Sequence, residues 1–78
     1  MELFSEIKAM IERICAVESE AVTEDAHLHF DLGADSLALV TLSSAISENY
    51  NIELLVEDIV ELENVGELVS LVESRTNV

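Results

Sequence analysis

The sequence predicts an all-α fold, a small four-helix bundle with three principal helices, a short third helix and a long first loop. Half of its 78 residues are hydrophobic but only three are aromatic, so the core must consist mainly of Leu, Ile and Val. In several segments the apolar residues recur every three or four positions, which is the period of an amphipathic helix. A chain of this length holds one hydrophobic core, so we expect residues 1–78 to form a single domain.

The first helix is predicted over residues 3–15, where the apolar positions lie three or four apart. Its apolar stripe consists of Leu3, Ile7, Ile11, Ile14 and Cys15. Between residues 16 and 35 this period fades and turn-forming side chains accumulate. We therefore expect a long loop, held to the core by Leu28, Phe30 and Leu32. A loop of this length is uncommon in a compact domain unless it has a function.

The second helix is predicted over residues 36–50. Gly33 permits a turn, Asp35 can cap the helix by accepting backbone N–H bonds, and Ser36 then lies on the first helical turn. Leu37, Val40 and Ser44 lie on another side of the helix, away from its core stripe, which indicates a contact surface. The core stripe consists of Leu39, Leu42, Ile46 and Tyr50.

Two more helices are predicted in the last third of the chain. Residues 56–62 are long enough for only a short helix, and a strand is the competing interpretation of so short an apolar run. Asn64 is a good N-cap for a fourth helix that ends near Ser74. Glu67, three residues after Asn64, resembles the second member of a capping box.

Charge and hydropathy restrict the partners. Seventeen acidic residues against three basic ones give a formal charge of −14, which would repel nucleic acids and anionic membrane surfaces. Partners should therefore present positive patches. The chain has no apolar run near the roughly 20 residues that a membrane-spanning helix needs. It has no basic segment followed by an apolar leader and only one cysteine, so we expect a cytoplasmic protein without an internal disulfide. We also expect a monomer.

The run Asp31-Leu32-Gly33-Ala34-Asp35-Ser36-Leu37 resembles the phosphopantetheine attachment sequence of acyl carrier proteins. The resemblance extends over essentially the whole chain. It implies that a separate phosphopantetheinyl transferase attaches the arm to Ser36, and that Asp35 and Leu37 are recognised by that enzyme. The arm would then tether acyl groups as thioesters, so the protein would be a carrier and not an enzyme. The start of a helix suits a phosphodiester, because free N–H groups and the positive end of the helix dipole lie there.

The resemblance also implies partner and cargo surfaces. The second helix would dock onto basic patches of acyl-loading, condensing and acyl-transfer enzymes of fatty-acid or polyketide-type synthesis. The residues expected on this docking face are Leu37, Val40, Thr41, Ser44 and Glu48. Thr41 and Ser44 stand where many fatty-acid carriers have an acidic and a large apolar residue. Candidate walls for an acyl chain, which would otherwise be ordinary core residues, are Leu42, Ile46, Leu54, Ile59 and Leu62.

Other interpretations remain open at this point. An aminoacyl or peptidyl carrier would share the chemistry of Ser36, and an acidic protein-interaction module would need no prosthetic group. His27 and His29 lie two residues apart in the loop, but two histidines without a convincing third ligand do not predict a metal site. Cys15 follows an apolar stripe, where a structural thiol is more common than a nucleophile. We therefore predict no metal site and no catalytic residue.

Overall fold

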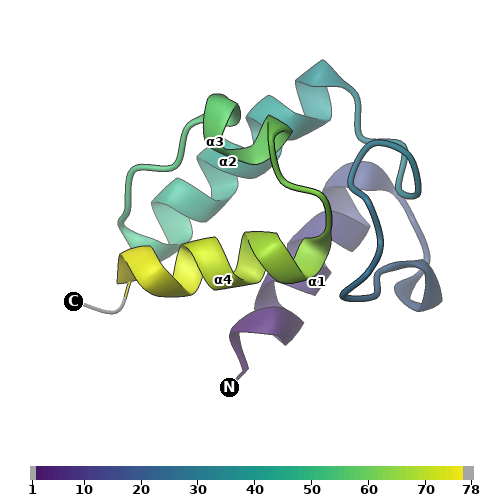
Figure 1. The fold of residues 1–78 in the computed structure, drawn as a ribbon, viewed down its shortest axis with the longest axis horizontal. Helices are drawn as coiled ribbons and strands as arrows, with labels where there is room; N and C mark the ends of the chain where they lie inside the picture. The colour runs from purple at the N-terminus through teal and green to yellow at the C-terminus, as the bar shows by residue number, and fades with distance from the viewer. Residues whose placement is uncertain (1, 77–78) are drawn as a thin grey trace.

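A computed structural model of the protein describes residues 2–76, and all the regular structure in this range is helical (Figure 1). This confirms the predicted fold class. The longest stretch without an α-helix lies between the first two helices, as expected, and contains one short 3₁₀ turn, η1. The elements are α1 (Leu3–Cys15), η1 (Ser19–Ala21), α2 (Ser36–Tyr50), α3 (Val56–Val60) and α4 (Val65–Thr76). None of the helices in this range is long and apolar enough to cross a membrane.

The core is aliphatic and is gathered around α1, which contacts α2, α4 and η1. The inward side of α1 is formed by Ile7, Met10 and Ile11. Each large aliphatic side chain that is fully buried stabilises the fold by about 1.5–3 kcal/mol relative to its exposed state. The largest fully buried side chains are Ile7, Ile11, Val22, Leu42, Ile46, Ile59, Val65, Leu68 and Val72.

The long loop packs onto this core through Leu28 and Leu32, as predicted, but not through Phe30. The Phe30 side chain is 80% exposed, so its expected anchoring role was wrong. The reason is a helical turn, in which the N–H groups of Asp31 and Leu32 both bond to the carbonyl oxygen of His27. In such a turn residues 28 and 32 share one side, which faces the core, while residue 30 points to the other side.

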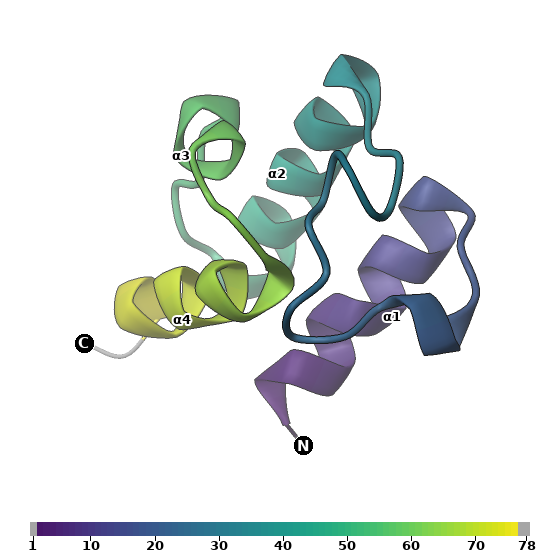
Figure 2. The ribbon, with the colours of Figure 1, turned by 45° about the vertical axis from the view of Figure 1, so that its right-hand side comes forward.

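The first turn of α4 fixes the middle of the long loop. Its Val65 and Gly66 N–H groups donate to the carbonyl oxygens of Ala26 (3.0 Å) and Glu24 (2.9 Å). Figure 2 shows the loop running past this end of α4 before it reaches α2. A Cβ atom on Gly66 would lie 3.3 Å from the Glu24 carbonyl oxygen, so glycine permits the close approach. Helix N–H groups without partners in their own helix are satisfied here by loop backbone.

The N-cap predicted for the fourth helix is present, but the predicted capping box is not completed in its usual form. Asn64 Oδ1 accepts the Glu67 N–H at 2.9 Å. The Glu67 carboxylate accepts the N–H of Glu63 at 2.8 Å, so the returning bond goes to the residue before the cap. The helix also continues to Thr76, beyond the predicted end near Ser74.

The short helix α3 packs against α2 and is also tied to α4 by a surface ion pair. Only Ile59 of its five residues is buried, and the helix ends at Val60 instead of Leu62. Asp58 Oδ2 accepts bonds from the Leu55 N–H and from Arg75 Nη1 of α4, both at 3.0 Å. These two bonds lower the pKa of Asp58, and the bond from Arg75 has the larger effect. The link between α3 and α4 is therefore complete at neutral pH and is lost as the pH falls through the pKa of Asp58.

A hydrogen bond between Tyr50 and Glu6 joins the end of α2 to the start of α1. The Tyr50 hydroxyl donates to Glu6 Oε1 at 2.6 Å. Burial, followed by this bond and the charge of Glu6, raises the pKa of Tyr50 from 10.0 to about 12. Because the folded-state pKa is the higher one, the stabilisation is complete below pH 10 and disappears as the pH rises through about 12.

We predict that the phenol titrates near pH 12 in the folded protein and closer to 10 in Glu6→Gln. The pKa of Tyr50 should not return fully to 10.0, because burial is the largest cause of its rise and the glutamine oxygen can still accept a bond from the phenol. Near-ultraviolet absorbance of the phenolate measures this directly, since the chain has one Tyr and no Trp. An unshifted titration in the native protein would contradict the bond.

Candidate functional site

Ser36 is the first residue of α2 and its side chain is exposed. The residue before it, Asp35, is the N-cap of the helix, and its Oδ1 accepts the N–H of Ala38 at 2.8 Å. This confirms the predicted cap. The backbone carbonyl of Asp35 accepts the Leu39 N–H at 2.9 Å, which starts the helical bonding. The Ser36 hydroxyl is therefore presented on a rigid first turn, beside backbone N–H groups that precede the internal bonding of the helix.

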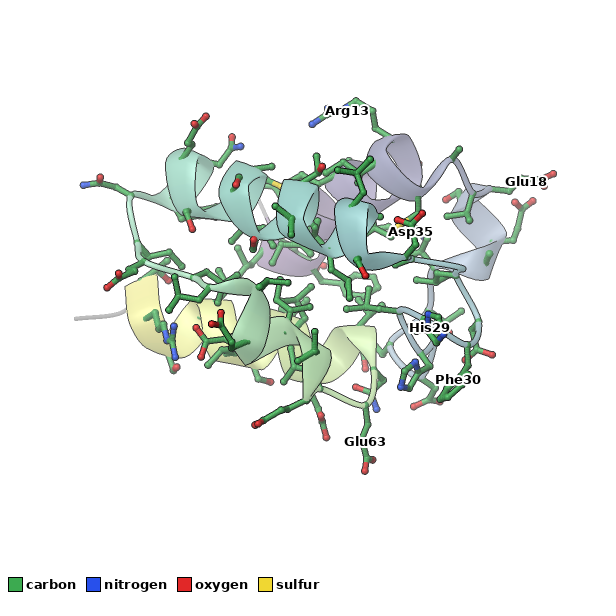
Figure 3. All side chains as sticks on the ribbon, turned by 90° about the horizontal axis from the view of Figure 1, so that it is seen from above. Arg13, Glu18, His29, Phe30, Asp35 and Glu63 are labelled. Atoms are coloured by element: carbon green, nitrogen blue, oxygen red, sulfur yellow. The ribbon has the colours of Figure 1, made fainter. Side chains whose placement is uncertain are left out.

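Two histidines shape the loop that leads to Asp35 (Figure 3). His27 Nδ1 accepts the N–H groups of His29 and Phe30, both at 3.1 Å. In return, Asp31 Oδ2 accepts the His27 N–H at 2.7 Å. His27 therefore acts as the N-cap of the turn at residues 28–32, a position usually taken by Ser, Thr, Asp or Asn.

His29 holds the end of the same loop. Its Nδ1 lies 3.0 Å from the carbonyl oxygen of Ala34, the residue before Asp35. A carbonyl oxygen only accepts, so His29 Nδ1 must carry the proton. Gly33, between His29 and Ala34, adopts the left-handed conformation that the turn requires, with a φ of 71°. The sequence interpretation missed both histidines as loop supports. The usual sequence signal was absent, because a capping box places the acidic residue three positions after the cap, whereas Asp31 lies four positions after His27.

These bonds also bear on metal binding. A neutral His27 whose Nδ1 accepts two N–H bonds carries its proton on Nε2, so it has no lone pair left for a metal ion. Among residues 2–76, no group of three or more His, Cys, Asp and Glu side chains is placed to hold an ion. The exposed ring of Phe30 packs against both imidazoles, with centroids 4.5 Å from His27 and 5.2 Å from His29.

Cys15, at the end of α1, is partly buried near the start of α2. Burial raises the pKa of its thiol, and the negative charge of Asp35 raises it further. The thiol is therefore protonated at neutral pH and is a poor nucleophile.

The five residues expected to bind partners lie on exposed positions of α2. The Leu37 side chain is 75% exposed and that of Val40 is 47% exposed. Thr41 is exposed, and its Oγ1 donates to the Leu37 carbonyl oxygen at 2.9 Å. Ser44 and Glu48 continue the row at helical spacing. The arrangement forms one face that begins beside Ser36, and its use by partners stays a prediction.

The residues expected to surround an acyl chain are mostly core residues. Leu42, Ile46 and Ile59 are fully buried, and Leu62 is half-buried. An open hollow of about 400 Å³ lies beside them, between α2 and α3. Of the five candidates only Leu54 lines it. The hollow is lined on the α2 side by Val40, Ser43, Ser44, Ser47 and Glu48, and on the other side by residues 54–57.

Comparison with known proteins gives consistent results. The family model described as "Phosphopantetheine attachment site" matches residues 5–72. The chain is 41% identical over 73 residues to a protein named acyl carrier protein from Helicobacter pylori strain J99, a match that covers 94% of both chains. It is 36% identical over 74 residues to an acyl carrier protein from Thermotoga maritima, covering 95% of this chain and 91% of the relative.

The His27 cap can be tested by two substitutions. His27→Ala should destabilise the protein by about 1 kcal/mol, the usual cost of losing an N-cap, and His27→Asn should recover most of this because Asn is a good cap. Urea unfolding measures the loss. Amide hydrogen exchange at His29 and Phe30 should be faster in the alanine variant alone. Equal exchange in all three proteins would show that the imidazole does not hold the turn.

Proposed function

The chain belongs to the acyl carrier protein family, whose members use phosphopantetheine as their prosthetic group, and we propose that this arm is attached to Ser36. One observation carries the assignment: Ser36 is exposed on the first turn of a helix, directly after the Asp35 cap and before Leu37. These three residues lie within the stretch that matches the attachment-site family.

The surroundings of Ser36 fit a phosphodiester. The hydroxyl oxygen can attack the phosphorus of coenzyme A that bears the pantetheine. The new O–P bond forms as the P–O bond of the pyrophosphate breaks, adenosine 3′,5′-bisphosphate leaves, and the serine proton passes to a base of the transferase. The N–H groups of the first turn of α2, and the positive end of its dipole, then stabilise the attached anion. The Asp35 carboxylate opposes this locally, so we assign it to capping and to recognition by the transferase. Once attached, the arm supplies a terminal thiol that holds acyl groups as thioesters.

We further propose that residues 1–78 act as one carrier domain that serves as substrate and shuttle in the cytoplasm, without catalysing a reaction itself. The cysteine chemistry supports this, because the Cys15 thiol has a raised pKa. The formal charge of −14 and the exposed face of Leu37, Val40, Thr41 and Ser44 favour partners with basic patches around an apolar centre. Acyl-loading, condensing and acyl-transfer enzymes are the partners that this role requires.

The attachment is tested by incubating the purified protein with coenzyme A and a broad-specificity phosphopantetheinyl transferase. We expect the intact mass to rise by one phosphopantetheine, located on the Ser36 peptide, and Ser36→Ala to gain nothing. Ser70→Ala, on an exposed position of α4, is the matched control and should be modified fully. Modification that persists in Ser36→Ala would reject the assignment. A folded native protein that takes no arm would favour an acidic interaction module instead.

The docking face is tested by introducing a lysine either on this face or away from it. Thr41→Lys puts a positive charge in the middle of the face, and Ser70→Lys puts the same charge on an exposed position of α4. Because a basic partner patch is repelled only by the first, kcat/KM of the transferase should fall about tenfold at low salt for Thr41→Lys and little for Ser70→Lys. The difference should shrink at high salt. Equal losses for both variants would mean that overall charge, not this face, guides the encounter.

A further inference from the structure

The two histidines of the long loop need opposite protonation states at the ring nitrogen that holds the loop. His27 Nδ1 accepts the N–H groups of His29 and Phe30, so this nitrogen must be free of a proton. His29 Nδ1 donates to the Ala34 carbonyl oxygen, so this nitrogen must carry one. We propose that the turn at residues 28–32 is a pH-sensitive switch, which opens when His27 takes up a proton while His29 keeps the end of the loop in place. The inference does not depend on the proposed arm.

The cap formed by His27 exists only while its ring is neutral. A protonated imidazole carries an N–H at both nitrogens and has no lone pair with which to accept a bond. The two backbone N–H groups that now bond to Nδ1, both at 3.1 Å, would then face a ring N–H and a positive charge. The open turn can therefore bind a proton that the closed turn cannot, so a falling pH shifts the balance toward the open turn. Histidine is the side chain whose charge ordinarily changes between about pH 5 and pH 8.

His29 responds to acid in the opposite way. A second proton, on Nε2, leaves the Nδ1–H in place and makes it a stronger donor to the Ala34 carbonyl oxygen, which lies 3.0 Å away. Backbone bonds fasten the same end of the loop, because the Ala34 N–H donates to the Leu28 carbonyl oxygen at 2.9 Å and the Gly33 N–H donates to the His29 carbonyl oxygen at 3.1 Å. Acid therefore releases the start of the turn but not its junction with Asp35.

Phe30 is the residue that the switch would set free. Its side chain is 80% exposed, and its ring packs against the imidazoles of His27 and His29 (Figure 3). At neutral pH the bonded N–H and the two neighbouring rings present a large apolar group in one position. Opening removes the bond that fixes the backbone of Phe30, so the position of this exposed ring becomes variable in acid. The switch would thus exchange a fixed aromatic surface for a mobile one, without moving the cap of α2.

The charges around His27 do not oppose its protonation. Asp31 contacts it directly, since Oδ2 accepts the His27 backbone N–H at 2.7 Å. The start of α4 packs against the loop through two backbone bonds. Besides His29, the titratable groups of these segments are the carboxylates of Glu24, Asp25, Asp31, Glu63 and Glu67. The basic residues of the chain lie elsewhere, on α1 and in the last turn of α4. Carboxylates stabilise a charged imidazole, whereas the two cap bonds stabilise the neutral ring, so gain of the proton and loss of the cap occur together.

The test compares amide hydrogen exchange of the full chain at about pH 7.5 and about pH 5.5, on either side of the ordinary titration of histidine. Protection factors, which remove the intrinsic effect of pH on exchange, should fall about fivefold at His29 and Phe30 in acid, the change that corresponds to loss of one N-cap. The protection of the Ala34 N–H should stay the same. Imidazole nitrogen-15 shifts at the higher pH should report the Nε2–H form of His27 and the Nδ1–H form of His29. Protection at Phe30 that does not change across this range would overturn the proposal.

Two variants assign the effect to one ring. His27→Asn keeps a side-chain oxygen that can cap the turn but does not titrate, so the protection of Phe30 should be the same at both pH values. His29→Gln keeps an N–H donor for the Ala34 carbonyl oxygen and removes the other titrating ring, yet it should retain the pH response. Thermal unfolding checks that both variants fold. A response that persists in His27→Asn, or that disappears in His29→Gln, would contradict the assignment of the switch to His27.

Discussion

The buried side of α1 is the surface on which the rest of this fold is assembled. Ile7, Met10 and Ile11 form it, and α2, α4 and η1 all contact the helix that carries it. With a formal charge of −14 the outer surface repels itself, so burial of aliphatic side chains must supply the cohesion. The direction of α2 follows from its packing on α1, and the direction of α2 determines where Ser36 is presented.

The segment that presents Ser36 is organised in a different way from the core. Its backbone groups are satisfied by His27 Nδ1 and the Asp31 carboxylate within the loop, and by the first turn of α4 from outside it. Leu28 and Leu32 attach it to the core, while the bonds fix its shape. A long loop can therefore be rigid at its functional end without becoming a helix, because few of its buried polar groups lack a partner.

Comparison of prediction with structure shows which signals are local. The bounds of α1 and α2 agreed with the sequence interpretation, because helical spacing and the Asp35 cap act within a few residues. The prediction for Phe30 was wrong because the orientation of its side chain depends on a helical turn, which apolar content alone does not reveal. The roles of His27 and His29 depend on which ring nitrogen meets which backbone group. The hollow depends on how α3 is held by Arg75, seventeen residues from Asp58, and such a contact leaves no pattern in the sequence.

The weak attachment of α3 has a kinetic consequence. This helix contributes one fully buried side chain, Ile59. It packs against α2 and is tied to α4 by the surface bonds of Arg75. Elements with few buried contacts open locally at a free energy far below that of global unfolding, and they do so quickly. Opening α3 separates it from α2 but leaves the packing of α1 against α2 in place. Because α3 forms part of one wall of the hollow, the width of the hollow should change each time this short helix opens, while the rest of the bundle stays folded.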